Sequence, residues 1–524
     1  MINQQIRAFF LFFLALVIIF SKAYSDESKH QNATKEYNGI GKTSLISKSS
    51  NSILDKKNVE ENFLEEINVN GIGLISIERT KFPSDLWRNS SEKILSEKLI
   101  SMPNLTLTST NKIFKRLLLV DAKPPLNSIG VKNMGYLFLL SRIDQLINLG
   151  AIDEVEEILN YIKEPSVELM KRKIQVASLN GRLSKTCDLA NKYPNFEGML
   201  QFKIICLVRK NDWQAAALAF TVGSSLKQFD EKEKKLLLNY LDPDIETNSL
   251  YDIEINDLSP TSFYLMHGKK ELIPPDILPN KYAYAFSLLG IPPKIRIKSM
   301  EQLASKYVVN ANTLFGLYRS SLIEDKENSN DATIVVMQLE KAFNSDSEHK
   351  KLLALKQATK VFQKKKLLVH LSNEYVDELK NLYYSDNKRL KDLAIALLSL
   401  TDGMTNEFIV LESSNPDINC LIDIKKKLFI KHETDSELCK LVKKLNIEII
   451  KKSFPANRNL DAQMEKGLIL LESLNLLANG LSTEFEEVKL SLSMLTKIGL
   501  IDLVNEISVE LIALNTLKKL VRNK

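Results

Sequence analysis

Residues 148–153 read NLGAID, residues 179–183 read LNGRL and residues 209–213 read RKNDW. Each stretch has the composition of a tight turn between two helices. An apolar side chain recurs at the same place in each turn, at Ile152, Leu183 and Trp213. The two spacings, 31 and 30 residues, lie within the range typical of stacked helical repeats. The segment therefore predicts an all-α fold, an α-solenoid of antiparallel helical hairpins similar to a tetratricopeptide superhelix.

A closely similar stretch occurs near the C-terminus. Residues 150–158, GAIDEVEEI, match residues 499–507, GLIDLVNEI, at six of nine positions. Glycine readily adopts the left-handed conformation that ends a helix, and aspartate favours the first turn of the next one. The match predicts the same turn and helix start in both places, so that the array continues to the end of the chain. Thr483 and Glu486 are expected to form a capping box for the helix before the second copy.

The composition agrees with a helical protein. The 524 residues include 17 glycines and 15 prolines, fewer than a turn-rich all-β fold would need. Charged residues make up 26% of the chain, and the formal net charge is +6. A charge this small for the length indicates no particular class of partner.

The N-terminus has the pattern of a cleaved secretion signal. Arg7 precedes an apolar run over residues 8–20, and the small side chains within residues 23–25 suit cleavage before Asp26. The run is shorter than the ~20 residues that span a bilayer. We therefore expect an exported, periplasmic protein, with retention of this segment as an anchor as the alternative.

Composition and proline placement divide the chain further. The expected parts are a signal peptide (1–25), a disordered polar leader (26–62), an N-terminal cap (63–125), a helical array (126–250), a Pro-rich helical corner (251–300) and a C-terminal helical array (301–524). Proline doublets at 274–275 and 292–293 mark the corner because proline stops a helix.

Two shorter elements are expected within the N-terminal cap. Residues 69–77, VNGIGLISI, are rich in β-formers and predict a short β-hairpin or an extended cap on the first helices. Residues 82–87, FPSDLW, are expected to begin a helix, with Ser84 or Asp85 as its N-cap.

The four cysteines fall into two pairs, each 19 residues apart: Cys187 with Cys206, and Cys420 with Cys439. In an array of hairpins this spacing places the second helix of one unit beside the first helix of the next, with Cβ atoms within ~4 Å. An oxidising compartment would permit two disulfides. Four buried thiols are the alternative, because cysteine is among the most buried residue types. Neither pair has the CxxC spacing of a redox or zinc site.

No catalytic or cofactor motif is present: the sequence has no GxSxG, HExxH, Walker loop or GxGxxG. No carboxylate is flanked by apolar residues in a way that singles out a raised pKa, so a catalytic acid and base pair cannot be named. The histidines are too scattered for a metal site: His30, His267, His349, His370 and His432. We therefore expect no enzyme activity, no cofactor and no metal. Trp87 and Trp213 are interpreted as packing residues.

One predicted helix carries a run of lysines. Residues 350–366 contain seven lysines and no acidic residue. Five of them form a candidate face for an anionic envelope surface or an acidic partner: Lys356, Lys360, Lys364, Lys365 and Lys366. The alternative is an ordinary solvated helix surface. Aromatic residues are too few there for a nucleic-acid groove, and export argues against one.

Three segments carry a family resemblance: residues 82–91 (FPSDLWRNSS), residues 140–150 (LSRIDQLINLG) and the Pro-rich corner at 273–294. Together they resemble a family of uncharacterised exported helical-repeat proteins of Gram-negative bacteria. The hairpins are also similar to tetratricopeptide units, which implies a concave surface that binds protein partners.

The sequence thus predicts a periplasmic binding or scaffold protein, with protein partners, in envelope assembly or maintenance. One alternative is an enzyme or accessory factor of cell-wall glycan (murein) metabolism. Another is peripheral attachment to a membrane through the basic helix at 350–366.

Overall fold

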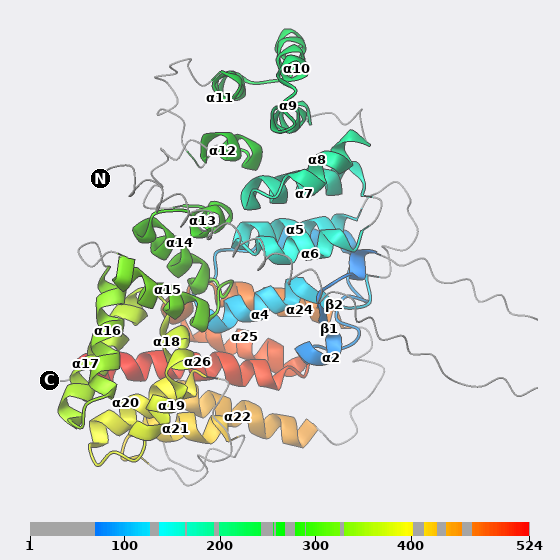
Figure 1. Ribbon diagram of the computed structural model, residues 1–524. Helices are drawn as coiled ribbons and strands as arrows, with labels where there is room; N and C mark the ends of the chain where they lie inside the picture. Colours follow the sequence, from blue (N-terminus) through cyan, green and yellow to red (C-terminus); the bar gives the residue numbers. More distant parts are fainter. Residues whose placement is uncertain are drawn as a thin grey trace, which may run out of the picture. The chain divides into compact units, whose positions relative to one another are not determined.

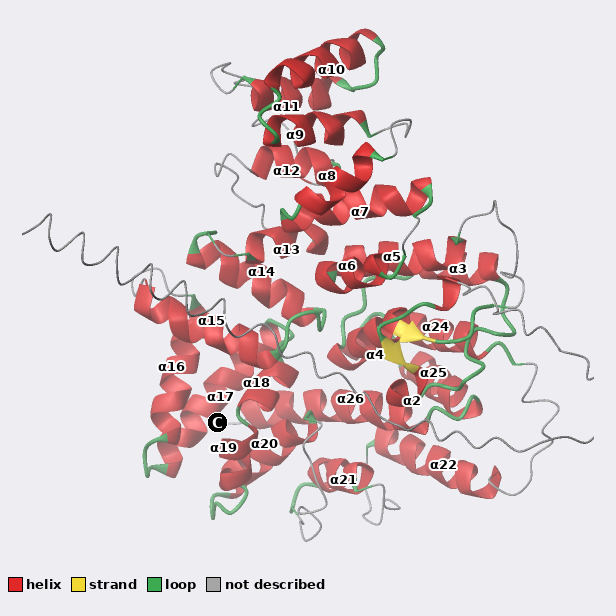
Figure 2. Ribbon diagram, turned by 45° about the vertical axis from the view of Figure 1, so that its right-hand side comes forward, coloured by secondary structure: helices red, strands yellow, loops and turns green. Residues whose placement is uncertain are grey.

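The computed structural model describes residues 69–125, 136–162, 165–192, 199–242, 255, 258–267, 278–288, 290–324, 330–401, 413–426, 436–452 and 464–522. All of them belong to one compact unit, residues 66–524. The predicted signal peptide (1–25) and leader (26–62) lie outside the described residues. Helices dominate the described part, which confirms the all-α prediction (Figure 2). None of the described helices combines the length and apolar character needed to cross a membrane.

The N-terminal half contains the first group of helices. They are α2 (Ile77–Thr80), α3 (Glu92–Ile100), α4 (Thr108–Leu119), α5 (Leu137–Leu149), α6 (Ile152–Asn160), α7 (Val167–Asn180), α8 (Ser184–Asn191), α9 (Leu200–Arg209), α10 (Trp213–Ser225) and α11 (Glu231–Leu241). Each helix from α5 to α11 packs against the next one along the chain. The pairs α5/α6, α7/α8 and α9/α10 lie in successive layers (Figure 1).

The chain then turns back along these layers. The returning helices are α12 (Pro260–His267), α13 (Asn280–Ser287) and α14 (Pro293–Ser305). Helices α12 and α13 pack against α7, and α13 also packs against α5. Pro293 occupies the start of α14, where its missing N–H leaves no helical hydrogen bond unmade. Helices α12 and α13 therefore cover part of α5 and α7, and the proline doublet at 274–275 lies outside the described residues.

The C-terminal half contains the remaining helices. They are α15 (Ala311–Glu324), α16 (Asp331–Phe343), α17 (Glu348–Lys364), α18 (Leu368–Glu374), α19 (Val376–Leu382), α20 (Lys388–Ser399), α21 (Pro416–Lys425), α22 (Glu437–Lys452), α24 (Lys466–Leu476), the 3-10 turn η7 (Gly480–Ser482), α25 (Phe485–Lys497) and α26 (Ile501–Arg522).

Helix α26 lies between two hydrophobic cores. Val504 and Ile507 belong to the cluster formed with the N-terminal layers, α24 and α25. Ile512 and Leu517 belong to the cluster formed by α14 to α22. The helix packs against α4, α17, α20, α21, α22 and α25. The last helix is therefore a central element that joins the two halves, and only its far end carries exposed lysines.

The two copies of the nine-residue match adopt the same turn. Gly150 has φ 83° and Gly499 has φ 79°, the left-handed conformation that favours glycine. Helices α6 and α26 begin at the equivalent residues Ile152 and Ile501. The predicted capping box is wrong, because α25 begins at Phe485 with Glu484 as its N-cap and has no side-chain cap.

The N-terminal cap packs directly on α24. The side chain of Trp87 is buried and meets the ring of Phe138 edge to face at 4.9 Å, which confirms its packing role. The N–H of Gly467 donates to the carbonyl oxygen of Leu86 at 2.8 Å. A Cβ atom at Gly467 would lie 2.5 Å from the Trp87 ring, so only glycine allows this approach.

Two expectations for the N-terminal cap are wrong. Strand β1 (Ile75–Ser76) pairs in parallel with β2 (Val120–Asp121), so no β-hairpin forms. Three helices intervene between the strands, and such a crossover permits parallel pairing. Residues 84–87 form turns in place of a helix start, and Asp85 binds Lys466 at 2.8 Å in place of capping a helix.

Arg142 of α5 connects these N-terminal elements through hydrogen bonds. Its guanidinium is buried and donates to three backbone carbonyl oxygens, those of Leu118 at 2.9 Å, Asn70 at 3.1 Å and Val120 at 2.7 Å. Burial lowers the pKa of Arg142 to about 10, which still leaves the side chain charged at neutral pH. One side chain thus satisfies carbonyls from η2 (Val69–Gly71), α4 and β2.

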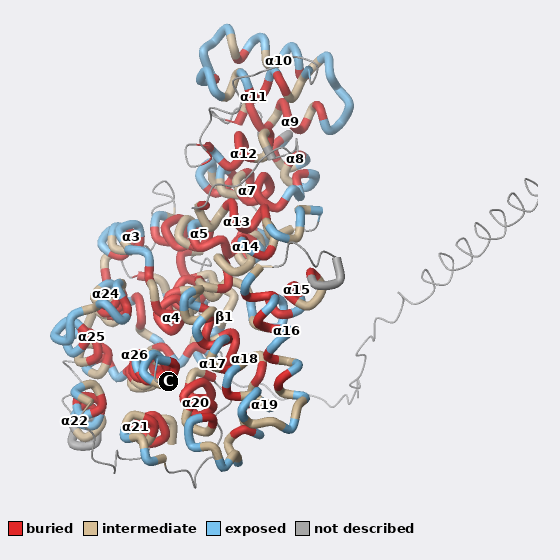
Figure 3. Tube along the Cα trace, turned by 90° about the vertical axis from the view of Figure 1, so that its left-hand side faces the viewer, coloured by how far each residue is buried: buried red, intermediate tan, exposed pale blue. Residues whose placement is uncertain are grey.

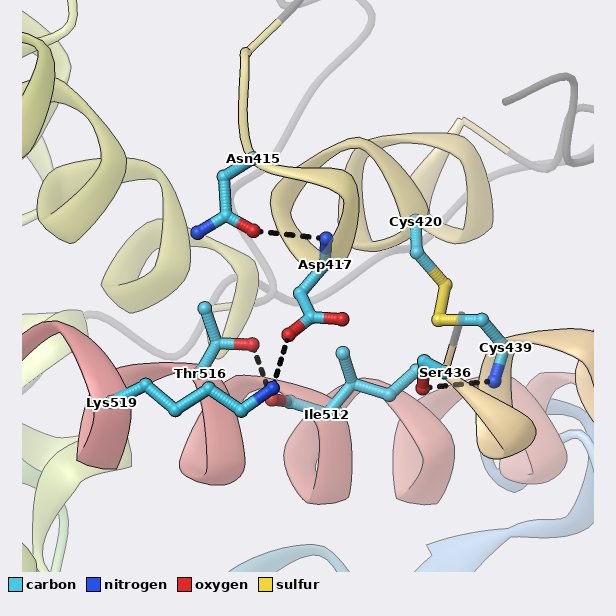
Figure 4. The surroundings of a disulfide bond; sticks show 8 residues. All are labelled: Asn415, Asp417, Cys420, Ser436, Cys439, Ile512, Thr516 and Lys519. Carbon is cyan, nitrogen blue, oxygen red and sulfur yellow. Dashed lines mark hydrogen bonds and ion pairs between the residues drawn. A yellow bond between two sulfur atoms is a disulfide. The ribbon is translucent and has the colours of Figure 1, made fainter. Parts of the chain in front are cut away.

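Both predicted disulfides are present in the structure. Cys187 of α8 is bonded to Cys206 of α9, with Cα atoms 5.6 Å apart. Cys420 of α21 is bonded to Cys439 of α22, with Cα atoms 6.3 Å apart, and this bond lies above α26 (Figure 4). The first bond joins the second helix of one layer to the first helix of the next, as the 19-residue spacing predicted.

Replacing Cys187 and Cys206 together by alanine is expected to lower the free energy of unfolding by about 2–3 kcal/mol. The bond closes a loop of 19 residues and so restricts the unfolded chain. Urea unfolding without reductant measures the change. In the matched control, reductant should destabilise the wild type further than the variant, which has one bond fewer to lose. Equal stability of the wild type and the variant without reductant would contradict the prediction.

Candidate functional site

Helix α10 has no charged residue. Its sequence from Trp213 to Ser225 is WQAAALAFTVGSS. Asn211, just before the helix, has φ 61°. The side chain of Asp212 caps the helix by accepting the N–H of Ala215 at 3.2 Å. A helix that is apolar or small all round is normally buried in a core.

Helix α10 nevertheless lies at the surface, with its small residues inside. The buried residues of the helix are Ala216 and Gly223. A Cβ atom at Gly223 would lie 2.5 Å from Leu200 Cδ2 and 2.6 Å from the ring of Phe229. The close approach of the helix to its neighbours therefore depends on small side chains.

Phe220 of this segment is partly buried, but the other large apolar side chains are exposed. Trp213 is 46% exposed, Leu218 66%, Val222 47% and Leu226 65%. Leu218, Val222 and Leu226 are spaced by four residues and follow one face of the helix. Trp213 is nine residues, or about two and a half turns, before Val222 and so lies on the opposite side of the helix. We call Leu218, Val222 and Leu226 the α10 face. A surface helix usually turns such side chains inward, so the α10 face is the reverse of the ordinary arrangement.

Two neighbouring helices hold α10 in place. Helix α10 packs against α9 and α11, and the rings of Phe220 and Phe229 stack at 6.2 Å. Figure 3 shows α10 as a largely exposed helix beside the more buried α9 and α11. Because the disulfide at Cys206 bonds α9 to α8, the helices that carry the face are also attached covalently to the layer next to them.

One of the five lysines predicted as an anionic-partner face is paired within the fold. Lys360, Lys364 and Lys366 are exposed on and after α17, and Lys356 is partly buried. Lys365 binds Glu301 at 2.7 Å and Asp331 at 3.2 Å. The charge of Lys365 is therefore balanced within the fold.

The histidines that the structure describes are not brought together. His370 is buried, and its Nε2 atom lies 2.9 Å from the carbonyl oxygen of Val309. Burial lowers the pKa of His370 and so favours the neutral ring. Within the described ranges, no group of three or more His, Cys, Asp or Glu side chains could hold a metal ion.

Sequence reasoning missed the α10 face. It assigned Trp213 to packing, and the structure shows this residue half exposed at the start of the helix. The available signal was the uncharged run from Trp213 to Leu226 in a chain that is 26% charged. Such a run predicts a buried helix equally well, so the pattern does not identify a surface.

Comparisons of the chain with models of protein families, with curated proteins and with solved structures found no match. The function of the α10 face is therefore inferred from its own geometry and chemistry.

Proposed function

We propose that this chain is an exported, periplasmic helical-repeat protein, a solenoid of antiparallel hairpins, that binds a partner protein through the α10 face. The observation that carries the proposal is the packing of α10, with Ala216 and Gly223 buried and Leu218, Val222 and Leu226 exposed on one face. A contiguous apolar surface is unfavourable in water and marks sites of interaction. The two disulfides support an oxidising compartment.

The partner expected is an exported protein that presents an apolar helix. The α10 face offers no ionisable group, so a charged partner segment would lose its hydration without compensation. Leucine and valine at four-residue spacing suit contact with the apolar stripe of another helix. Such binding fits a scaffold role in envelope assembly or maintenance.

Replacing Leu218 and Val222 together by aspartate is expected to weaken partner binding about 100-fold. Each side chain contributes about 1.5 kcal/mol when buried, and ~1.4 kcal/mol corresponds to a factor of ten. Stability should change by less than about 0.5 kcal/mol, because both residues are exposed before binding. The matched control is Gln228→Asp, which adds one aspartate at an exposed position next to the α10 face.

The measurement is photo-crosslinking in the source cells from a probe placed at position 226, in the wild type, the double variant and the control. The proposal predicts a partner band that persists in Gln228→Asp and disappears in the double variant. A band of equal strength in the double variant would refute it. Recovery of a second copy of the chain alone would show self-association and would also contradict binding of another protein.

A further inference from the structure

Two adjacent cavities lie on either side of α4. The first has a volume of about 670 Å³ and lies among α2, α4, the ends of α20 and α21, and α26. The second has a volume of about 700 Å³ and lies among α4, α6, α18 and the turn after α14. Lys112 and Arg116 line both cavities and separate them. The first cavity therefore has basic side chains in the wall that faces the second.

The first cavity has more cationic than anionic side chains. Its cationic groups are Arg79, Lys81, Lys112, Arg116 and Lys425. Three carboxylates also line it, and they belong to one face of α26 with a spacing of four residues: Asp502, Glu506 and Glu510. Five positive groups against three carboxylates leave a positive excess even when every carboxylate is ionised.

The structure already assigns partners to the three carboxylates. Asp502 lies 3.1 Å from Lys81. Glu506 binds two cations, Lys112 at 3.4 Å and Arg116 at 3.2 Å. The carboxylate of Glu510 accepts the backbone N–H groups at the start of α4 and is buried. None of the three binds Arg79, which is exposed and makes no ion pair within the described part of the chain.

Three buried polar side-chain atoms of residues that line the first cavity have no hydrogen-bond partner among the described residues. They are Nε of Arg116, Oγ of Ser109 and the side-chain oxygen of Asn505. Nε of Arg116 is a donor that requires an acceptor, and an amide can present either its oxygen or its nitrogen. Buried polar groups in folded proteins are almost always satisfied, so these three atoms mark this wall of the cavity as polar.

We infer that the first cavity binds a small phosphorylated sugar or polyol. Arginine and lysine are the side chains that recognise phosphate oxygens, and the exposed guanidinium of Arg79, which makes no ion pair among the described residues, provides donors. The volume far exceeds that of a bare anion and suits a molecule with an organic part. Hydroxyl groups of the ligand can donate to Asp502 or Glu506 and exchange hydrogen bonds with Asn505. This site lies on α2, α4 and α26 and is independent of the α10 face.

Isothermal titration calorimetry on the full exported chain tests the inference. The probes are glucose 6-phosphate, glycerol phosphate and glucose. At least one phosphate probe should bind at least about tenfold more tightly than glucose, with an affinity that falls as salt is raised. Failure of both phosphate probes to bind at millimolar concentration would overturn the inference, as would equal binding of glucose.

Two variants locate the binding in the cavity. Arg79→Gln should weaken phosphate-probe binding about five- to tenfold, and Asn505→Asp, which adds a negative charge to the cavity, should abolish it. The matched control is Arg88→Gln, at an exposed arginine that does not line the cavity, and it should bind as the wild type does. Unchanged binding in both cavity variants, with melting temperatures near that of the wild type, would overturn the assignment.

Discussion

Replacing Arg142 by methionine is expected to lower the free energy of unfolding by about 4 kcal/mol. Methionine has similar length and no donors, so the carbonyl oxygens of Asn70, Leu118 and Val120 would lose their shared partner. A buried carbonyl without a hydrogen bond costs about 1–3 kcal/mol. Loss of the guanidinium also removes a cation–π contact with the ring of Phe138.

Urea unfolding followed by circular dichroism measures the effect. Arg142→Lys should recover only part of the loss, because an ammonium group lacks the planar fork that reaches three carbonyls. Arg88→Met is the matched control, at an exposed arginine, and should change stability by less than about 0.5 kcal/mol. An Arg142→Met protein as stable as the control would show that the three hydrogen bonds do not hold the N-terminal elements together.

Replacing Glu510 by alanine is expected to lower the free energy of unfolding by about 3 kcal/mol. The Glu510 carboxylate accepts the N–H groups of Thr108 at 2.8 Å and Ser109 at 2.6 Å, and so caps α4 from a distant part of the chain. Alanine would leave those donors buried without a partner and would open a cavity. Glu510→Gln keeps an acceptor oxygen and should lose much less stability.

The same position gives a dependence on pH. Burial raises the pKa of Glu510, although hydrogen bonds from Thr108 and Ser109 oppose the rise. In the unfolded chain this carboxyl group has a pKa of about 4.3. Between that pH and the higher pKa of the folded state, the folded protein keeps a proton that the unfolded chain has released. The stability contributed by Glu510 is fully present below that pH and is lost as pH rises through the folded pKa. Wild-type stability should thus fall relative to Glu510→Gln between acidic and neutral pH.

Urea titrations of the wild type and Glu510→Gln at several pH values measure this difference. A difference that stays constant across the range would show that Glu510 has no raised pKa in the folded protein. A wild type that gains stability relative to Glu510→Gln as pH rises would show that its pKa is lowered.

Sequence reasoning succeeded where the signal is local. The turns at Gly150 and Gly499 follow from the left-handed backbone that glycine adopts at a helix end. The disulfide between Cys187 and Cys206 follows from a fixed spacing between neighbouring layers. In both cases the relevant residues lie within one or two helices of each other, so the local pattern determines the geometry.

Sequence reasoning failed where the partner is remote. Nothing near Glu510 in the sequence indicates that it caps a helix 402 residues earlier. Strand β1 pairs with β2, and three helices separate the two strands in the sequence. The expected hairpin would have required a partner strand adjacent in the sequence. The α10 face was missed for another reason, since burial of a uniformly apolar helix depends on which elements happen to cover it.

The position of α26 between the two cores has a consequence for biosynthesis. A ribosome synthesises the segments of α2 and α4 long before it makes α26. Lys81, however, pairs with Asp502 of α26, and the N–H of Thr108 donates to Glu510 of α26. Because contacts between such distant segments form late, the amino-terminal layer stays incomplete until α26 has been made. A nonsense mutation that removes α26 would therefore leave both halves without a shared core and expose the product to aggregation and proteolysis.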